Sequence, residues 1–113
     1  MANKKNPFGF KIVDGVIFGS LKIGFSISGV LHKDFSLREA IVDDLLSAED
    51  EADVMKPLSF NAQLMVRQLV KVGTFEGPFT EGMIRRLKPA DWRILRAAQT
   101  EIDNVGEAES ASE

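Results

Sequence analysis

The sequence predicts an α+β fold: a small N-terminal antiparallel sheet of three to four strands over about residues 8–38, followed by about four helices over about 40–103. Apolar and polar residues alternate before residue 38, as in half-buried strands. From about residue 40, apolar residues recur every three or four positions, as in amphipathic helices. Five of the nine glycines precede residue 30, where tight turns between short strands need them. A chain of 113 residues has room for one hydrophobic core, so residues 1–103 are predicted to form a single domain.

The predicted sheet begins with a hairpin. Asp14-Gly15 separates the apolar stretches 10–13 and 16–18, and this dipeptide favours the turn that suits the twist of two strands. A strict alternation follows, and its apolar members share one face: Leu21, Ile23, Phe25 and Ile27. Ser28-Gly29 interrupts this strand, and a further alternation over 31–37 completes the sheet.

The first predicted helix starts near residue 40 and stops at Met55-Lys56-Pro57, because a residue before proline disfavours the α region. Val42 and Leu46 widen an apolar stripe with spacings of four, three and four. This stripe consists of Ile41, Leu45, Ala48 and Ala52. Acidic residues take the remaining positions, so we expect one buried apolar face and one strongly negative face.

Three further helices are predicted. Ser59 is a candidate N-cap of the second helix, which Gly73 ends. Thr80 is a candidate cap of a short helix that runs through Leu87. Lys88-Pro89-Ala90-Asp91 opens the last helix, with proline in the tolerated first turn and the acid at the positive end of the helix dipole. The buried face of this helix is predicted to comprise Trp92, Leu95, Gln99 (or Ala98 in its place) and Ile102.

Charge is segregated along the chain, although the net formal charge is only −3. Residues 1–38 sum to +4, residues 39–53 to −7, residues 54–103 to +3 and residues 104–113 to −3. The last segment has one apolar residue beyond alanine and is predicted to be a disordered acidic tail. The remainder is neutral, which argues against nonspecific nucleic-acid binding as the main task, since that binding needs a dominant positive field.

The sequence offers little for enzymatic chemistry. Nucleophilic catalysis needs a positioned base, and His32, the only imidazole, is expected to be an exposed turn or strand residue. There is no glycine-rich phosphate loop, and the acidic run 49–53 lacks the ligand spacing and glycine of a calcium loop. We therefore predict no enzymatic activity, no cofactor and no metal.

Composition also bears on location. The absence of cysteine excludes a disulfide framework and makes a reducing cytoplasm the simplest location. The longest apolar runs have three residues, whereas a membrane span needs about 20, and the N-terminus lacks the apolar stretch of a secretory signal. We predict no membrane partner.

A basic cluster supports one nucleic-acid hypothesis. Its members surround a short helix, a turn and a second helix, which superficially resembles a helix-turn-helix. The turn, however, carries Pro89 and no glycine, and the neighbouring segment 39–53 is strongly acidic. The alternatives are a solvated face or ion pairs with those acids. The cluster consists of Arg85, Arg86, Lys88, Arg93 and Arg96.

Two groups of residues are candidates for partner binding: the aromatics Phe75, Phe79 and Trp92, and the acids Glu49, Asp50 and Glu51. The phenylalanines flank Gly77-Pro78 in a loop, and the tryptophan lies at the start of the last helix. These aromatics either cover the core or, if exposed, form a docking site. The acids are either a solvated helix face or a contact for a basic partner.

Two longer segments resemble a known family. Residues 32–49, HKDFSLREAIVDDLLSAE, resemble the core motif of tail assembly chaperones from Mu-like transposable phages. That motif has a strand ending in an aromatic residue, a Leu-Arg-Glu or Leu-Arg-Pro step and a helix of the form x-V-x-D-L-L-x-A-E. The matching positions are Phe35, Leu37, Arg38, Val42, Asp44, Leu45, Ala48 and Glu49. Segments 72–79 and 83–91 are similar to the family's helix, loop and closing helix start, so the resemblance covers roughly residues 30–103.

The resemblance implies a non-enzymatic protein of the host cytoplasm, made late in infection and absent from the mature virion. Such chaperones bind the tape measure protein, keep it soluble and help recruit tail tube protein subunits around it. In many of these phages a longer form arises by programmed ribosomal frameshifting, and the C-terminal tail would be the point where such an extension departs. The acidic face of residues 39–53 would engage basic stretches of a client, or self-associate through the positive segment of another copy.

Two other classes stay open at this point. One is a structural component of the virion, such as a minor tail or connector protein. The other is a small DNA-binding regulator that uses Arg85 to Arg96.

Overall fold

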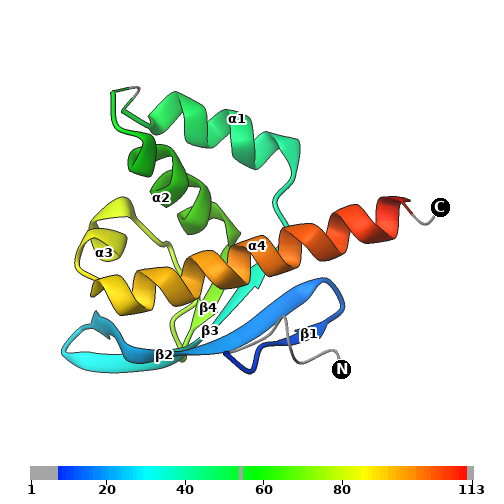
Figure 1. Ribbon diagram of the computed structural model, residues 1–113. Coiled ribbons are helices and arrows are strands. Elements are labelled where there is room, and N and C mark those ends of the chain that lie inside the picture. The colour runs from blue at the N-terminus through cyan, green and yellow to red at the C-terminus, as the bar shows by residue number, and fades with distance from the viewer. Residues whose placement is uncertain (1–7, 54, 112–113) are drawn as a thin grey trace.

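The computed structural model describes residues 8–53 and 55–111. Within them, four antiparallel strands form one sheet and four helices lie on one side of it (Figure 1), so the α+β class is as predicted. The elements, in chain order, are β1 (Lys11–Val13), β2 (Val16–Ile27), β3 (Val30–Arg38), α1 (Val42–Glu51), α2 (Pro57–Gln68), β4 (Leu69–Val72), α3 (Glu81–Arg85) and α4 (Pro89–Ala111).

The first three strands form a meander through two tight turns at the predicted dipeptides, and the sheet order is β1-β2-β3-β4. At the first turn, Asp14 and Gly15 have φ of 52° and 77°. At the second, Ser28 and Gly29 have φ of 51° and 80°. Consecutive residues with positive φ give a hairpin turn whose twist matches that of the flanking strands.

The fourth strand corrects the prediction that the second helix runs on to Gly73. That helix ends at Gln68, and β4 follows directly, with Leu69 and Val72 buried. Val72 pairs with Phe35, and Leu69 pairs with Leu37. The periodicity of a short apolar run fits a helix and a strand equally well. Residues 69–72 form a strand because the edge of β3 offers hydrogen-bond partners to their backbone.

β2 departs from the predicted alternation. Its pairing with β3 shifts between Ser20 and Phe25, so the strand bulges there. Ile23, predicted to share the buried face with Leu21 and Phe25, is 41% exposed. A bulge changes which side chains face inward, and no local pattern announces it.

Asp91 binds the backbone of this bulge. Its fully buried carboxylate accepts N–H groups from Lys22 (2.8 Å), Ile23 (3.2 Å) and Gly24 (2.8 Å). Asp91 lies in the first turn of α4, where the helix dipole favours a negative charge, as predicted. The structure adds that the same carboxylate fastens β2 to the start of α4.

The first helix is the largest correction. The predicted stripe included Ile41, Leu45 and Ala48, but only Ala48 is buried, together with Asp44, which the pattern had assigned to the negative face. α1 packs on α2, and Figure 1 shows it as the outermost helix, above α2 and α4 and away from the sheet. Its apolar stripe therefore does not face the core.

The helix starts are partly as predicted. α2 begins three residues earlier than expected, with Lys56 in place of Ser59 as N-cap and Pro57 in the first turn. Ser59 is instead buried inside the helix, where its hydroxyl accepts the backbone N–H of Asp53 at 3.0 Å. Thr80 caps α3 as predicted, with its hydroxyl 3.4 Å from the backbone nitrogen of Met83.

The last helix is longer than predicted. The sequence placed the end of the domain at residue 103, whereas the backbone of α4 continues to Ala111. Extending an existing helix needs no new nucleus, and alanine and glutamate are good helix formers, so the low apolar content after residue 103 does not end the helix. On its buried face both Ala98 and Gln99 are covered, which resolves the alternative left by the periodicity.

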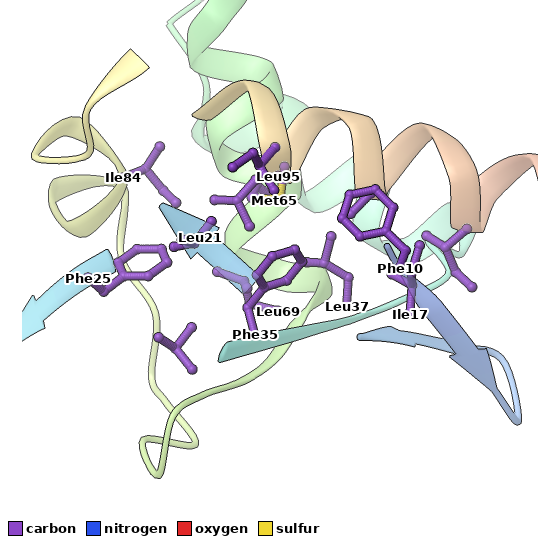
Figure 2. Close-up of a cluster of buried hydrophobic side chains, with 14 of the residues drawn as sticks. Phe10, Ile17, Leu21, Phe25, Phe35, Leu37, Met65, Leu69, Ile84 and Leu95 are labelled. Atoms are coloured by element: carbon purple, nitrogen blue, oxygen red, sulfur yellow. The ribbon is translucent and has the colours of Figure 1, made fainter. Parts of the chain in front are cut away.

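The core lies between the sheet and α4, and α2 and α3 contribute to it (Figure 2). Every layer supplies fully buried side chains, which include Ile17, Leu37, Met65, Val72, Leu95 and Ile102. The rings of Phe10 and Phe35 meet edge-on, with centroids 6.2 Å apart, over the backbone of Gly19. This core is complete without any residue of α1.

Candidate partner-binding surface

The predicted aromatic residues are half-buried. Phe75 and Phe79 pack against each other edge-on, with ring centroids 5.3 Å apart and an interplanar angle of 90°. Phe79 and Trp92 also pack against the core. This placement fits the interpretation that they cover the core, and their binding of a partner stays a prediction.

Trp92 also lines a groove of about 570 Å³ between the start of α2, α3 and the start of α4. Within it, the Glu81 carboxylate accepts from the Gln63 amide at 2.7 Å and pairs with Arg85 at 2.7 Å. These hydrogen bonds, the one from Gln63 first, lower the pKa of Glu81. The groove's apolar lining includes Met55, Leu58, Ala62, Ile84 and Leu87.

The second predicted group lies elsewhere, in the last turn of α1. Glu49, Asp50 and Glu51 are all exposed, and within the described residues none of them has an ion-pair partner. No basic residue occupies that turn. The negative end of the helix dipole therefore meets three carboxylates, a locally unfavourable arrangement. These acids do not line the groove that contains Trp92.

Four large apolar side chains beside these acids are exposed. They form what we call the α1 apolar face: Ile41 (59% exposed), Val42 (67%), Leu45 (40%) and Leu46 (57%). Positions three and four apart lie on one side of a helix, so these residues form a continuous stripe. Sequence reasoning identified the stripe but assigned it to the core.

An ion pair fixes the rotation of α1. The guanidinium of Arg38, at the end of β3, binds the Asp44 carboxylate through two hydrogen bonds of 2.7 and 2.8 Å. The same guanidinium donates to the carbonyl oxygen of Arg67 on α2 at 2.7 Å. Because Asp44 and Ala48 are held inward, Val42 and Leu46, on the opposite side of the helix, face outward. Arg38 and Asp44, two residues of the quoted motif six positions apart, were the signal that could have revealed this orientation.

The Asp44 carboxylate is strongly bound in this position. Its side chain is 8% exposed, and it also accepts the backbone N–H of Ile41 at 2.9 Å. The hydrogen bonds from Arg38 are the main cause that lowers the pKa of Asp44, and burial opposes them. The charged carboxylate is therefore part of the folded structure.

The segment that leads into α1 is tied to α4 as well. The Asp103 carboxylate accepts the backbone N–H of Ala40 at 3.3 Å and the side-chain amide of Gln68 at 3.4 Å. Gln68 in turn donates to the carbonyl of Arg38 at 2.9 Å and accepts from Gln99 at 2.7 Å. The segment that leads into α1 is thus held by a partly buried polar network of residues from β3, α2 and α4.

The basic cluster does not pair with the acidic segment. Arg85 binds Glu81 on its own helix, and Arg96 donates to Gln99. Among the described residues, the ion pairs of the acidic segment are made with Arg38 and Lys56. α3, the first helix of the arrangement that resembles a helix-turn-helix, is only five residues long.

The described residues contain neither a metal-binding cluster nor a membrane-spanning helix. No group of three or more His, Cys, Asp or Glu side chains there is arranged to hold a metal ion. In the same residues no helix has the length and apolar character that crossing a membrane requires.

Residues 21–113 match the model of the family described as tail assembly protein gp41, a span that includes β2 from Leu21 on and every later element. The chain belongs to this gp41 family. The match confirms the predicted resemblance to Mu-like phage tail assembly proteins and extends beyond the roughly 30–103 that carried it. Membership assigns the chain to phage tail assembly.

Two relatives from Escherichia phage Mu are similar to this gp41 family member. One is described as probable tail assembly protein gp41; it is 26% identical over 114 residues, covering 91% of this chain and 75% of the relative. The other, probable tail assembly protein FS-gp41, is also 26% identical over 114 residues, and the chain spans 57% of its length. No solved structure matches the chain. Arg38, Asp44 and the α1 apolar face all lie within the span matched by the family.

Proposed function

We propose that the protein is a tail assembly chaperone that binds the tape measure protein, keeps it soluble and helps recruit tail tube subunits around it. It acts in the host cytoplasm without catalysing a reaction and does not remain in the virion. The observation that carries this proposal is the exposed α1 apolar face in a chain that belongs to a tail assembly family.

Leaving the α1 apolar face exposed to water costs free energy. Fully burying a large apolar side chain contributes about 1.5–3 kcal/mol. The four residues of the face lie outside the core and are 40–67% exposed, so covering each of them contributes roughly half of that. A tape measure protein is largely a long helix whose apolar residues are exposed before assembly. A complex would therefore remove apolar surface of both partners from water, which supports a holding function.

Co-expression tests this function. The tape measure protein of the same phage would be produced alone and together with this chain, and its soluble fraction and co-purification would be measured. We expect the tape measure protein to become soluble and to co-purify only in the presence of this chain. Mass spectrometry of purified particles should lack this chain, and its stoichiometric presence there would favour a structural virion component instead.

A DNA-binding role is the weaker alternative. The exposed basic residues Arg86, Lys88 and Arg93 favour it, whereas the exposed acids in the last turn of α1, which have no ion-pair partner within the described residues, oppose it. Phosphate contacts weaken steeply with salt, so a DNA mobility shift at low salt that disappears at higher salt would support this role. We expect no shift at low salt.

A further inference from the structure

We infer that the α1 apolar face, together with the carboxylates that flank it, is the docking surface for a basic amphipathic helix of the client. This inference rests on the proposed function and deepens it. It names the surface and the chemistry of the segment bound: an apolar stripe bordered by lysine or arginine.

The shape of the surface favours a helix as the occupant. α1 has 10 residues and, at 1.5 Å per residue, is about 15 Å long, which corresponds to about three turns of a partner helix. Val42, Leu45 and Leu46 form a ridge at helical spacing, and such ridges pack into the grooves of another helix. α1 is also the outermost helix, so a partner reaches it without displacing another element (Figure 1).

Charge selects the occupant. Exposed acids stand at both ends of the ridge, Glu39 and Asp43 near its start and Glu49, Asp50 and Glu51 at its end. Two copies meeting through this face would bring their acids together, and DNA or an anionic membrane would be repelled. A basic helix is attracted, and its cations would also relieve the clash of the last three carboxylates with the helix dipole.

The test uses the full chain and two probes: the co-expressed tape measure protein, and a designed helical peptide with leucines on one face bordered by lysines. The apolar variant is Leu45→Ser with Leu46→Ser. The charge variant is Glu49→Lys with Asp50→Lys and Glu51→Lys. The matched control, Met55→Ser with Leu58→Ser, removes two exposed apolar residues that line the groove beside Trp92.

We expect the apolar and charge variants each to weaken binding of both probes by about tenfold or more, and the control to stay within about twofold. The charge variant should unfold at the same or higher urea concentration than the wild type, since it removes unfavourable charges from the helix end. Loss of binding by a variant that is no less stable separates a docking role from a structural one. Binding of the wild type should also weaken with salt.

Three results would overturn the inference. Binding of the tape measure protein that is unchanged in both α1 variants would do so while leaving the chaperone function intact. Loss of binding only in the Met55/Leu58 variant would move the surface to the groove. A wild-type oligomer that dissociates only in the apolar variant, with client binding unchanged, would assign the face to self-association. If the wild type binds the peptide through α1 but not the tape measure protein, the proposed function fails and the docking surface stands.

Discussion

At Asp91 one carboxylate satisfies three consecutive backbone N–H groups of the β2 bulge. Those amides belong to the stretch where the pairing with β3 shifts, so the carboxylate substitutes for the strand partner that the bulge removes. A buried carboxylate without a cation beside it is stable only where several donors converge on it. The convergence of the bulge and the first turn of α4 meets that condition.

Asp91→Asn should destabilise the domain by about 2–4 kcal/mol, because one acceptor oxygen is replaced by a donor that faces backbone N–H groups. Urea unfolding would measure the loss, and amide exchange at residues 22–24 should accelerate. Glu101→Gln, a half-buried acid on the same helix, serves as the control with little expected change. Equal stability of wild type and Asp91→Asn would contradict the role assigned to this carboxylate.

Gly73 is the second residue on which the fold depends closely. Its φ is 59°, its N–H donates to the carbonyl of Asp34 at 2.7 Å, and a Cβ there would lie 2.1 Å from Nδ1 of His32. Gly29, with φ of 80°, has open space around the same position. The two glycines therefore separate the cost of backbone conformation from the cost of the steric clash.

We expect Gly29→Ala to cost about 1–2 kcal/mol from the left-handed backbone alone. Gly73→Ala should cost more, because His32 must also move. Adding His32→Ala to Gly73→Ala should recover the part of the lost stability that comes from the clash with the imidazole, as measured by thermal or urea unfolding. Equal losses for the two glycine variants, or no recovery in the double variant, would mean that the imidazole does not press on Gly73.

At the scale of the element, α1 shows how a partly buried ion pair can override hydrophobic periodicity. The stripe of the sequence is a valid amphipathic pattern, but Arg38 holds Asp44 inward and so turns the stripe to solvent. An Arg–carboxylate pair with two parallel hydrogen bonds has a fixed geometry, whereas apolar contacts have none. The orientation of α1 was therefore decided by two residues.

The ion pair makes stability depend on pH in a defined direction. The pKa of Asp44 is lowered in the folded protein, so its contribution is fully present above the ordinary carboxyl pKa of about 4 and is lost as the pH falls through the lower folded value. Asp44→Asn should cost on the order of 1–2 kcal/mol at neutral pH, since Arg38 is partly exposed and solvent screens the pair. The difference in unfolding free energy between this variant and the wild type should become smaller below about pH 4.

Urea midpoints measured from neutral to acidic pH would check this dependence. The control is Asp43→Asn, which alters an exposed acid in the same helix turn. Its midpoint should stay close to that of the wild type at every pH. A difference in urea midpoint between wild type and Asp44→Asn that is constant with pH would contradict the contribution assigned to the charged Asp44 carboxylate.

At the scale of the whole molecule, the hydrophobic core and the exposed helix α1 are separate parts of the domain. The sheet, α2, α3 and α4 enclose the buried residues, while α1 lies on the outside, packs on α2 and is held by the hydrogen bonds between Arg38 and Asp44 (Figure 1). This division explains why the α1 apolar face is available for binding without opening the core. It also places the most negative segment of the chain beside that face.

Much of this arrangement follows from the sequence alone. The α+β class, the hairpins at Asp14-Gly15 and Ser28-Gly29, the Thr80 cap and the start of α4 were predicted, because turn and capping signals act within a few residues. The family resemblance was also visible in local strings. The acidic run of α1 was recognised as a candidate partner contact, which stays a prediction until it is tested.

The tertiary structure alone decided the rest. β4 formed because β3 offered a free edge, the bulge in β2 needed the carboxylate of Asp91 from another part of the chain, and α1 turned outward because Asp44 had a partner in Arg38. In each case a residue far along the chain, or on another element, supplies the hydrogen bonds. Periodicity reports which residues can share a face. Which face is buried depends on partners that only the folded chain brings together.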